Sequence, residues 1–210
     1  MKKALHFLYV LVGTAVCRVL LIWWNIRDAI FPVHSNSVLF VAHPDDDTLF
    51  FHTFIKRNKP YVCLMTDGWS LRRMPCFFKA MRRYGVRYRA YPLDSRDPRD
   101  YVLRKNVQRV LRLNQFDIVA THNAEGEYGH EEHIRVHNSV IHNFKKNNGN
   151  FTILCPALRK DIENYPLDEK ETQEKEYIFN SIYTTESWVL SEEESGTPVW
   201  VRHEHLEELK

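Results

Sequence analysis

The chain begins with one long apolar segment and then changes to short apolar runs separated by amphipathic stretches. Residues 4–24 contain three strongly polar side chains, His6, Thr14 and Arg18. About 20 apolar residues are enough to cross the hydrocarbon core of a membrane. From Asn36 onward, short apolar runs predict strands, and the stretches between them have the periodicity of helices.

These runs alternate regularly along the chain. The predicted strands are 38–42, 61–65, 86–91, 116–121 and 151–154, and the predicted helices are 48–56, 70–84, 100–113, 130–146 and 168–183. Alternation of this kind predicts an α/β fold, Rossmann-like, with a mainly parallel sheet and helices on both faces. The hydrophobic helix precedes it, so we expect an anchor and connector at 1–32 and one domain at 33–210.

The N-terminal segment has three possible interpretations: an uncleaved membrane anchor, a cleaved signal peptide, or a helix packed on the domain. Arg18 lies near enough to the end to reach the membrane surface, and Trp23 and Trp24 are typical of the interfacial belt. A small-x-small cleavage site does not follow Trp24, which argues against removal. We therefore expect a protein anchored in a membrane by a single span. The charges that flank the span do not decide on which side of the membrane the domain lies.

Composition and charge limit the classes of function that the chain can have. A chain of 210 residues with 44% hydrophobic content can bury one core, and a net charge of +2 does not indicate a nucleic-acid binder. Residues 72–105 hold eleven basic and three acidic side chains, whereas 161–194 hold eleven acidic and two basic ones. Such runs are typical of solvated helix faces, but the basic one also suits an anionic substrate or lipid surface. Glycine-rich phosphate loops are absent, so we expect no nucleotide cofactor.

The four cysteines have no close-paired spacing, so the sequence predicts neither a disulfide framework nor a thiolate zinc site. The oligomeric state is not encoded in any of these patterns.

The first cluster with chemical potential is Ala42-His43-Pro44-Asp45-Asp46-Asp47, directly after the first predicted strand. Open α/β sheets place their active sites at the carboxyl ends of strands. One imidazole and three carboxylates at such a point repel one another unless a positive charge lies among them. A divalent metal ion would supply that charge.

The second cluster runs from Glu125 to His133 and follows the fourth predicted strand. His130 and His133 are one helical turn apart and face the same way, at the same edge of the sheet as His43. The zincin motif is excluded, because Ile134 stands where that motif needs glutamate. Two histidines and a carboxylate favour Zn²⁺ or Fe²⁺ over Mg²⁺, which prefers oxygen ligands.

Together, His43-Pro44-Asp45-Asp46 and Tyr128-Gly129-His130-x-x-His133 resemble the motifs of the PIG-L/LmbE-like zinc-dependent de-N-acetylases, which include N-acetylglucosaminyl-phosphatidylinositol deacetylase. The likeness extends from about Ser37 to Tyr183. It implies that domain 33–210 is a hydrolase that uses metal-activated water. The expected substrate is an N-acetylglucosamine-type sugar that is free, lipid-linked or part of a glycan, and the hydrolase removes its N-acetyl group.

The resemblance also implies roles for single residues. His43, Asp46 and His133 correspond to the ligands of Zn²⁺, with Fe²⁺ as the other possible metal, and leave one position open. Asp45 corresponds to the general base. His130 corresponds to the group that stabilises the oxyanion or protonates the amine, and Tyr128 to a tyrosine that assists at the oxyanion.

Supporting residues follow from the same resemblance. Arg72 or Arg73 corresponds to an arginine that contacts substrate, and Glu132 to a carboxylate that orients His130. Asp47 stands where the family usually has glutamate. The resemblance therefore does not define the role of Asp47 in this loop. The remaining histidines at 52, 122, 137 and 142 are expected at the surface or behind the ligands.

Two alternatives stay open. Asp45-Asp46-Asp47 also matches the Asp-x-Asp signature of glycosyltransferases that use Mn²⁺ or Mg²⁺, many of which carry an N-terminal anchor. That interpretation leaves His43, His130 and His133 without a role. The substituted Asp47 also leaves room for a membrane-tethered pseudoenzyme that binds carbohydrate without cleaving it.

Overall fold

A computed structural model describes residues 2–94, 99–146, 150–190 and 198–209. Its centre is a six-stranded sheet in the order β3-β2-β1-β4-β5-β6, in which β6 alone runs antiparallel to its neighbour. The strands are β1 (Ser37–Val41), β2 (Tyr61–Leu64), β3 (Tyr88–Ala90), β4 (Ile118–Thr121), β5 (Thr152–Pro156) and β6 (Leu206–Glu208).

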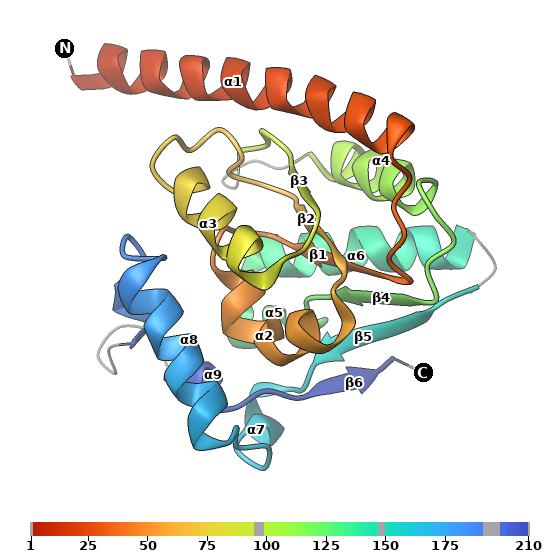
Figure 1. The fold of residues 1–210 in the computed structure, drawn as a ribbon, viewed down its shortest axis with the longest axis vertical. Coiled ribbons are helices and arrows are strands. Elements are labelled where there is room, and N and C mark those ends of the chain that lie inside the picture. Colours follow the sequence, from red (N-terminus) through yellow and green to blue (C-terminus); the bar gives the residue numbers. More distant parts are fainter. Residues whose placement is uncertain (1, 95–98, 147–149, 191–197, 210) are drawn as a thin grey trace.

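Helices surround this sheet (Figure 1). They are α1 (Lys2–Ile30), α2 (Asp46–Asn58), α3 (Met74–Tyr84), α4 (Asp100–Leu111), α5 (Gly126–Gly129), α6 (Glu131–Lys146), α7 (Arg159–Ile162), α8 (Glu169–Ser181) and α9 (Pro198–Arg202), with a 3₁₀ turn η1 (Ser187–Leu190).

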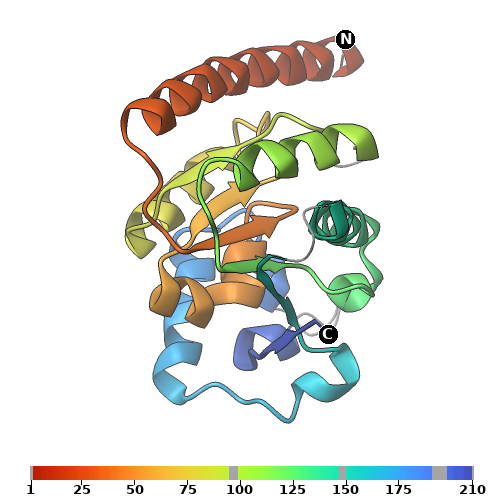
Figure 2. The same cartoon turned by 90° about the vertical axis from the view of Figure 1, so that its right-hand side faces the viewer.

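Alternate residues of the central strand face two different cores. Leu39 and Val41 of β1 pack with α2, α3, α8 and α9, whereas Val38 and Phe40 pack with α4 and α6. Figure 2 shows the two helical layers on opposite sides of the sheet. Because β1 is buried on both faces, it reads as a continuous apolar run. The predicted α/β class with a mainly parallel sheet is confirmed.

Each predicted strand and helix is present, and the differences lie at the ends. The helix expected from residue 70 begins at Met74, because Pro75 lies in its first turn and residues 66–73 form a loop. Strand β6 was not predicted. It is three residues long and carries two glutamates, so it has no apolar run to mark it.

Helix α2 is broken in its second turn, where Phe51 has φ −133° and ψ 18°. The break exposes backbone groups, and side chains from the last third of the chain satisfy them. Glu204 accepts a hydrogen bond from the N–H of Thr53 at 2.8 Å, and Lys175 donates to the carbonyl of Leu49 at 2.8 Å. The C-terminal region thereby holds the helix whose first turn carries Asp46.

Helix α1 lies along the β3 edge of the sheet (Figure 1). Its segment Leu5–Ile30 has 26 residues and a mean hydropathy of 2.1, so it is long and apolar enough to cross a membrane. A signal sequence or a core helix would meet the same criterion.

The C-terminal end of α1 is fixed by the carboxylate of Asp28, which is buried against β2 and β3. It accepts hydrogen bonds from the Tyr61 hydroxyl at 2.6 Å and from Arg87 and Arg89 at 2.8 Å each. Arg27 adds a fourth at 2.9 Å. A carboxylate shared by three guanidinium groups is strongly stabilised in its charged form.

Candidate metal centre

The two polar clusters meet at the carboxyl ends of β1 and β4. These strands are neighbours, but the chain leaves them in opposite directions, toward β2 and toward β5. Such a switch point opens a crevice in doubly wound sheets. Here a cavity of about 480 Å³ lies between the clusters, and its lining includes His43, Asp45, Asp46, Tyr128 and His130.

Because of a sharp turn after β1, the side chains of the three aspartates point in different directions. Asp45 has φ 129°, a conformation that non-glycine residues rarely adopt. Its carbonyl accepts hydrogen bonds from the N–H groups of Thr48 and Leu49 at 2.9 Å each, which starts α2. Asp46 is fixed by the N–H of His43, which donates to its Oδ2 at 2.7 Å.

The donor atoms of His43, Asp46 and His133 converge. Nδ1 of His43 lies 3.3 Å from Nε2 of His133 and 3.5 Å from Oδ2 of Asp46. Oδ1 of Asp46 lies 3.4 Å from Nε2 of His133. A tetrahedral ion with bonds of 2.0–2.2 Å needs ligand atoms about 3.3–3.6 Å apart. The two histidine nitrogens therefore have the spacing that such an ion requires, and Asp46 presents a different oxygen to each of them. The compact three-residue donor groups at this point are His43 with His130 and His133, and Asp46 with His122 and His133.

The charge distribution also favours a cation at this position. Burial alone would lower the pKa of His133, but Asp46 and Glu127 raise it to about 10. Burial alone would raise the pKa of Asp46, yet His133 and His122 hold it well below the usual range. Asp46 and His133 thus stabilise each other as a carboxylate and an imidazolium, and a divalent ion at this position would take the place of the His133 proton, because a ligating histidine is neutral.

Glu127 holds His133 in place and was not predicted as a site residue. Its Oε2 lies 2.6 Å from Nδ1 of His133, on the far side of the ring from the converging donors, and its Oε1 accepts the N–H of Asn123 at 2.8 Å. Burial opposes ionisation, but His122 and His133 lower the pKa of Glu127 to about 2. A carboxylate behind a ligating histidine fixes its tautomer and raises its basicity. The sequence signal was present, since Glu127 belongs to the second cluster.

His122 is fully buried and stacks on His133, with ring centroids 3.9 Å apart. Its Nε2 accepts the N–H of Ala42 at 2.9 Å, and its Nδ1 lies 3.1 Å from Glu127. Asp46, His122 and His133 also form a group compact enough for a metal. Because the Nε2 lone pair of His122 already accepts a backbone hydrogen bond, we favour His43 as the third ligand.

Arg73 lies against the carboxylates around the cavity. Its guanidinium is 3.2 Å from Asp45, 2.9 Å from Asp67 and 3.0 Å from Glu186. Burial raises the pKa of Asp45 well above its usual value, and Arg73 opposes that shift. Arg72 is exposed and lines a neighbouring cavity that also contains Arg73. Of the two arginines expected to contact substrate, the structure thus brings Arg73 beside the metal centre.

His130 and Tyr128 line the other side of the cavity. Nδ1 of His130 lies 2.8 Å from Oε2 of Glu132, as expected for a carboxylate that orients this ring. Burial, followed by the neighbouring His133 and His43, lowers the pKa of His130 to about 4. The ring of Tyr128 is 5.5 Å from that of His130, centroid to centroid.

Asp47 points away from the converging donors. It accepts hydrogen bonds from the Tyr183 hydroxyl at 2.6 Å and from Thr48 at 2.9 Å, and the N–H of Asp45 lies 3.3 Å away. Burial raises its pKa to about 6, against the effect of the Tyr183 hydrogen bond. The shorter side chain therefore braces the loop that carries the ligands.

Another donor group, His52 with Glu171 and Glu174, lies between α2 and α8. Lys56 already occupies it, with its ammonium 2.8 Å from Glu171 and 2.5 Å from Glu174. His137 is buried and bonded to the carbonyl of His122, and His142 is exposed.

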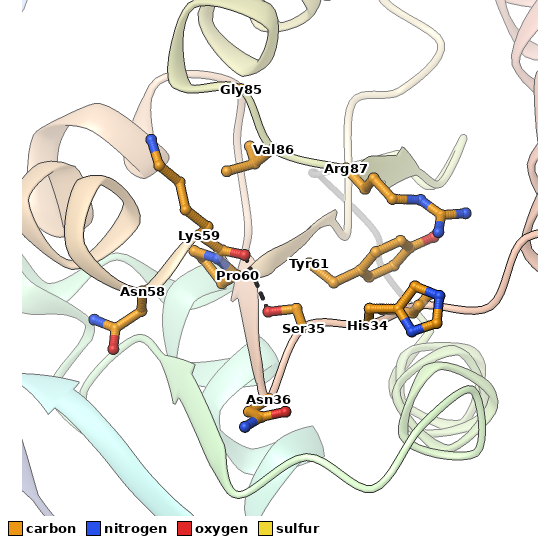
Figure 3. Close-up of a pocket in the computed structure, with 11 residues that line it drawn as sticks. His34, Ser35, Asn36, Asn58, Lys59, Pro60, Tyr61, Gly85, Val86 and Arg87 are labelled. Atoms are coloured by element: carbon orange, nitrogen blue, oxygen red, sulfur yellow. Dashed lines mark hydrogen bonds between the residues drawn. The ribbon is translucent and has the colours of Figure 1, made fainter.

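A second cavity, of about 470 Å³, lies at the opposite edge of the sheet, around the amino ends of β1, β2 and β3 (Figure 3). Its polar groups hold the scaffold together. The Ser35 hydroxyl donates to the carbonyl of Lys59 at 3.0 Å, and Lys59 and Arg87 donate to the carbonyls of Tyr84 and Pro32. This cavity lacks the convergent donors of the metal centre among its described residues.

No protein-family model matches the chain, and no curated protein sequence matches it. Among solved structures, the fold is similar to a deacetylase triple mutant (Orf2*T) of the teicoplanin biosynthetic pathway, with 12% identity and a TM-score of 0.55 over 78% of this chain and 87% of that one. It is equally similar to GalB, the 4-carboxy-2-hydroxymuconate hydratase of Pseudomonas putida KT2440, with 14% identity and a TM-score of 0.55 over 78% of this chain and 81% of that one.

At these identities the likeness shows the fold. The chain has the α/β fold shared by a solved deacetylase and a solved hydratase, together with a His/Asp group able to hold a metal ion. The resemblance to the PIG-L/LmbE-like family is supported at the level of the fold.

Proposed function

We propose that this protein is a metal-dependent hydrolase that removes the N-acetyl group from an N-acetylglucosamine-type sugar. The observation that carries the proposal is the approach of Nδ1 of His43 and Nε2 of His133 to 3.3 Å, with one oxygen of Asp46 3.5 Å from the first and the other 3.4 Å from the second. The cavity of about 480 Å³ is within the range of small-molecule sites.

His43, Asp46 and His133 would hold Zn²⁺, or Fe²⁺, whose ligand preferences are similar. A bound ion of this kind polarises an amide carbonyl and lowers the pKa of water. Asp45 would accept a proton from the attacking water, and Arg73, 3.2 Å away, favours the ionised carboxylate that this role needs. His130, held by Glu132 and neutral near pH 7, would pass to the departing nitrogen the proton that Asp45 takes from the water, and Tyr128 would donate to the oxyanion.

The fold itself does not choose between hydrolysis and hydration, because one fold hosts many chemistries. The Asp-x-Asp alternative is disfavoured by geometry. Asp45 contacts Arg73 whereas Asp47 contacts Tyr183, so the two carboxylates do not face a common ion. The pseudoenzyme is disfavoured because donors, base and acid lie together around one cavity.

The test is acetate release by the zinc-loaded full chain from a panel of N-acetylated sugars and glycolipids. Asp45→Asn should keep its metal but lose at least about 100-fold in turnover, as expected for loss of a general base. Asp117→Asn, a matched change at an exposed position, should behave like the wild type. The proposal fails if no member of the panel is deacetylated, or if Asp45→Asn is fully active.

A further inference from the structure

The outer face of α1 is exposed and apolar. Sixteen large hydrophobic side chains are exposed in the part of the chain that the structure describes, and twelve of them lie within residues 5–31. Leu8, Val12, Val19, Ile22 and Ile26 follow helical spacing along one side and are 45–66% exposed. A continuous apolar face of this kind marks an interaction surface.

The inner face of the same helix packs on the domain along most of its length. Tyr9 contacts the ring of Trp69 at 6.1 Å, and a Cβ on Gly13 would lie 1.8 Å from the carbonyl oxygen of Trp69. Farther along, Trp24 is buried and Asp28 is held by three arginines. These contacts cover 20 residues, about 30 Å of helix. A helix attached in this way cannot be surrounded by lipid on all sides.

Exposed cations lie on α1 and beside it. The acidic residues among the described residues 2–93 are all buried, in the metal centre or, for Asp28, under α1. Arg18 is exposed on α1 itself, and the exposed Arg72 lies beside it, because the N–H of Arg72 donates to the Tyr9 hydroxyl at 2.9 Å. Exposed cations beside an apolar face are complementary to an anionic lipid surface, because lipid headgroups supply negative charge next to hydrocarbon.

We propose that α1 docks in the plane of an anionic membrane, with its outer face in the boundary between headgroups and acyl chains, instead of crossing the bilayer. Arg18 and Asn25, seven residues apart, lie together on one flank of that face, where headgroups would solvate them. The domain then rests on the membrane by its β3 edge, which α1 covers.

Docking in this orientation places the metal centre close to the lipid surface. A cavity of about 420 Å³ is lined by Tyr9 of α1 and by Arg72, and it shares Arg73 and Glu186 with the cavity of the metal centre. The helix that binds lipid therefore borders the approach to the site.

The first experiment measures binding of the purified full chain to vesicles by flotation. We expect binding to vesicles that contain phosphatidylglycerol and weak binding to pure phosphatidylcholine. The double variant Val19→Asp/Ile26→Asp should bind at least about tenfold more weakly, because charges on the outer face would enter hydrocarbon. Leu209→Asp, at an exposed apolar position directly after β6 at the opposite sheet edge, should bind normally. A wild-type chain that stays with the aqueous phase, or that only dimerises through this face, overturns the proposal.

The second experiment separates docking from spanning. The full chain is expressed with tags at both ends, and sealed membrane vesicles are treated with an external protease. In-plane docking predicts that both tags are cleaved or both are protected. Cleavage of one tag alone would show a span and overturn the proposal. Trp23 is 54% exposed and Trp24 is 1% exposed, so brominated lipids should quench Trp23 selectively, and Trp23→Phe should remove most of the quenching.

Discussion

Asp45 and Glu127 have positive φ angles, 129° and 57°, in segments that supply the metal centre. Such conformations cost about 1–3 kcal/mol each and persist where the surrounding structure requires them. At Asp45 the turn lets neighbouring carboxylates face different partners. At Glu127 it turns the side chain back under His133. Backbone strain is therefore concentrated where the donors are aimed.

The role of Glu127 gives a direct prediction. Glu127→Gln keeps the shape but removes the negative charge behind His133, so affinity for Zn²⁺ should fall about 10–100-fold. Competition with a chromogenic chelator measures this at constant pH. Glu125→Gln, an exposed change two residues away, is the matched control. Equal affinity in both variants would show that Glu127 does not support the ligand.

At the scale of single residues, the sequence predicts that His43, Asp46 and His133 lie near one another, and their role as metal ligands stays a prediction. His43, Asp46 and His133 could be placed together because each follows a strand that ends at the same sheet edge. The contacts of Glu127 and His122 depend on how the loop after β4 folds back, which no local pattern encodes. The engagement of Arg73 with Glu186, 113 residues later in the chain, was equally beyond reach.

Among the elements, α1 shows the greatest difference between pattern and structure. Its apolar length predicts a span, but its inner face packs against Trp69 and β3. Hydropathy averages around the helix and cannot distinguish one face from another. The short elements β6 and η1 escaped prediction for a different reason, because three or four residues carry too little periodicity.

The Asp28 cluster at the end of α1 predicts a pH-dependent stability. Burial would raise the pKa of Asp28, but Tyr61, Arg27 and Arg89 lower it below its usual value of 3.8. A lowered pKa means that Asp28 stabilises the fold fully above about pH 4, and that this contribution is lost as the pH falls further. Asp28→Asn leaves buried guanidinium groups unpaired, so it should lower the free energy of unfolding by about 3 kcal/mol at pH 7.

Urea unfolding of the full chain in detergent, followed by circular dichroism from pH 7 to pH 3, measures this effect. The gap between the wild type and Asp28→Asn should close below about pH 4. The exposed Asp117→Asn variant should follow the wild type throughout. A gap that stays constant with pH would show that the charge of Asp28 does not carry the stabilisation.

For the molecule as a whole, the strand order determines where both the candidate metal centre and helix α1 lie. The switch point between β1 and β4 joins two clusters about 90 residues apart, and the sheet edge at β3 carries α1. The acidic stretch lies mainly on α8, beyond α2 from the sheet, and continues into residues 191–194, outside the described residues. Among the described residues the basic stretch lies mainly on α3, β3 and α4, and it meets the acidic stretch where Arg83 of α3 stacks on Tyr177 of α8.

The proposed hydrolase depends most on one ion held by His43, Asp46 and His133. Mass-spectrometric metal analysis of the purified full chain after loading with Zn²⁺ and desalting tests it directly. We predict about one ion per chain in the wild type and in the exposed control His142→Ala, and almost none in His133→Ala. A wild-type chain without bound metal, or a His133→Ala chain that binds as much as the wild type, would contradict it.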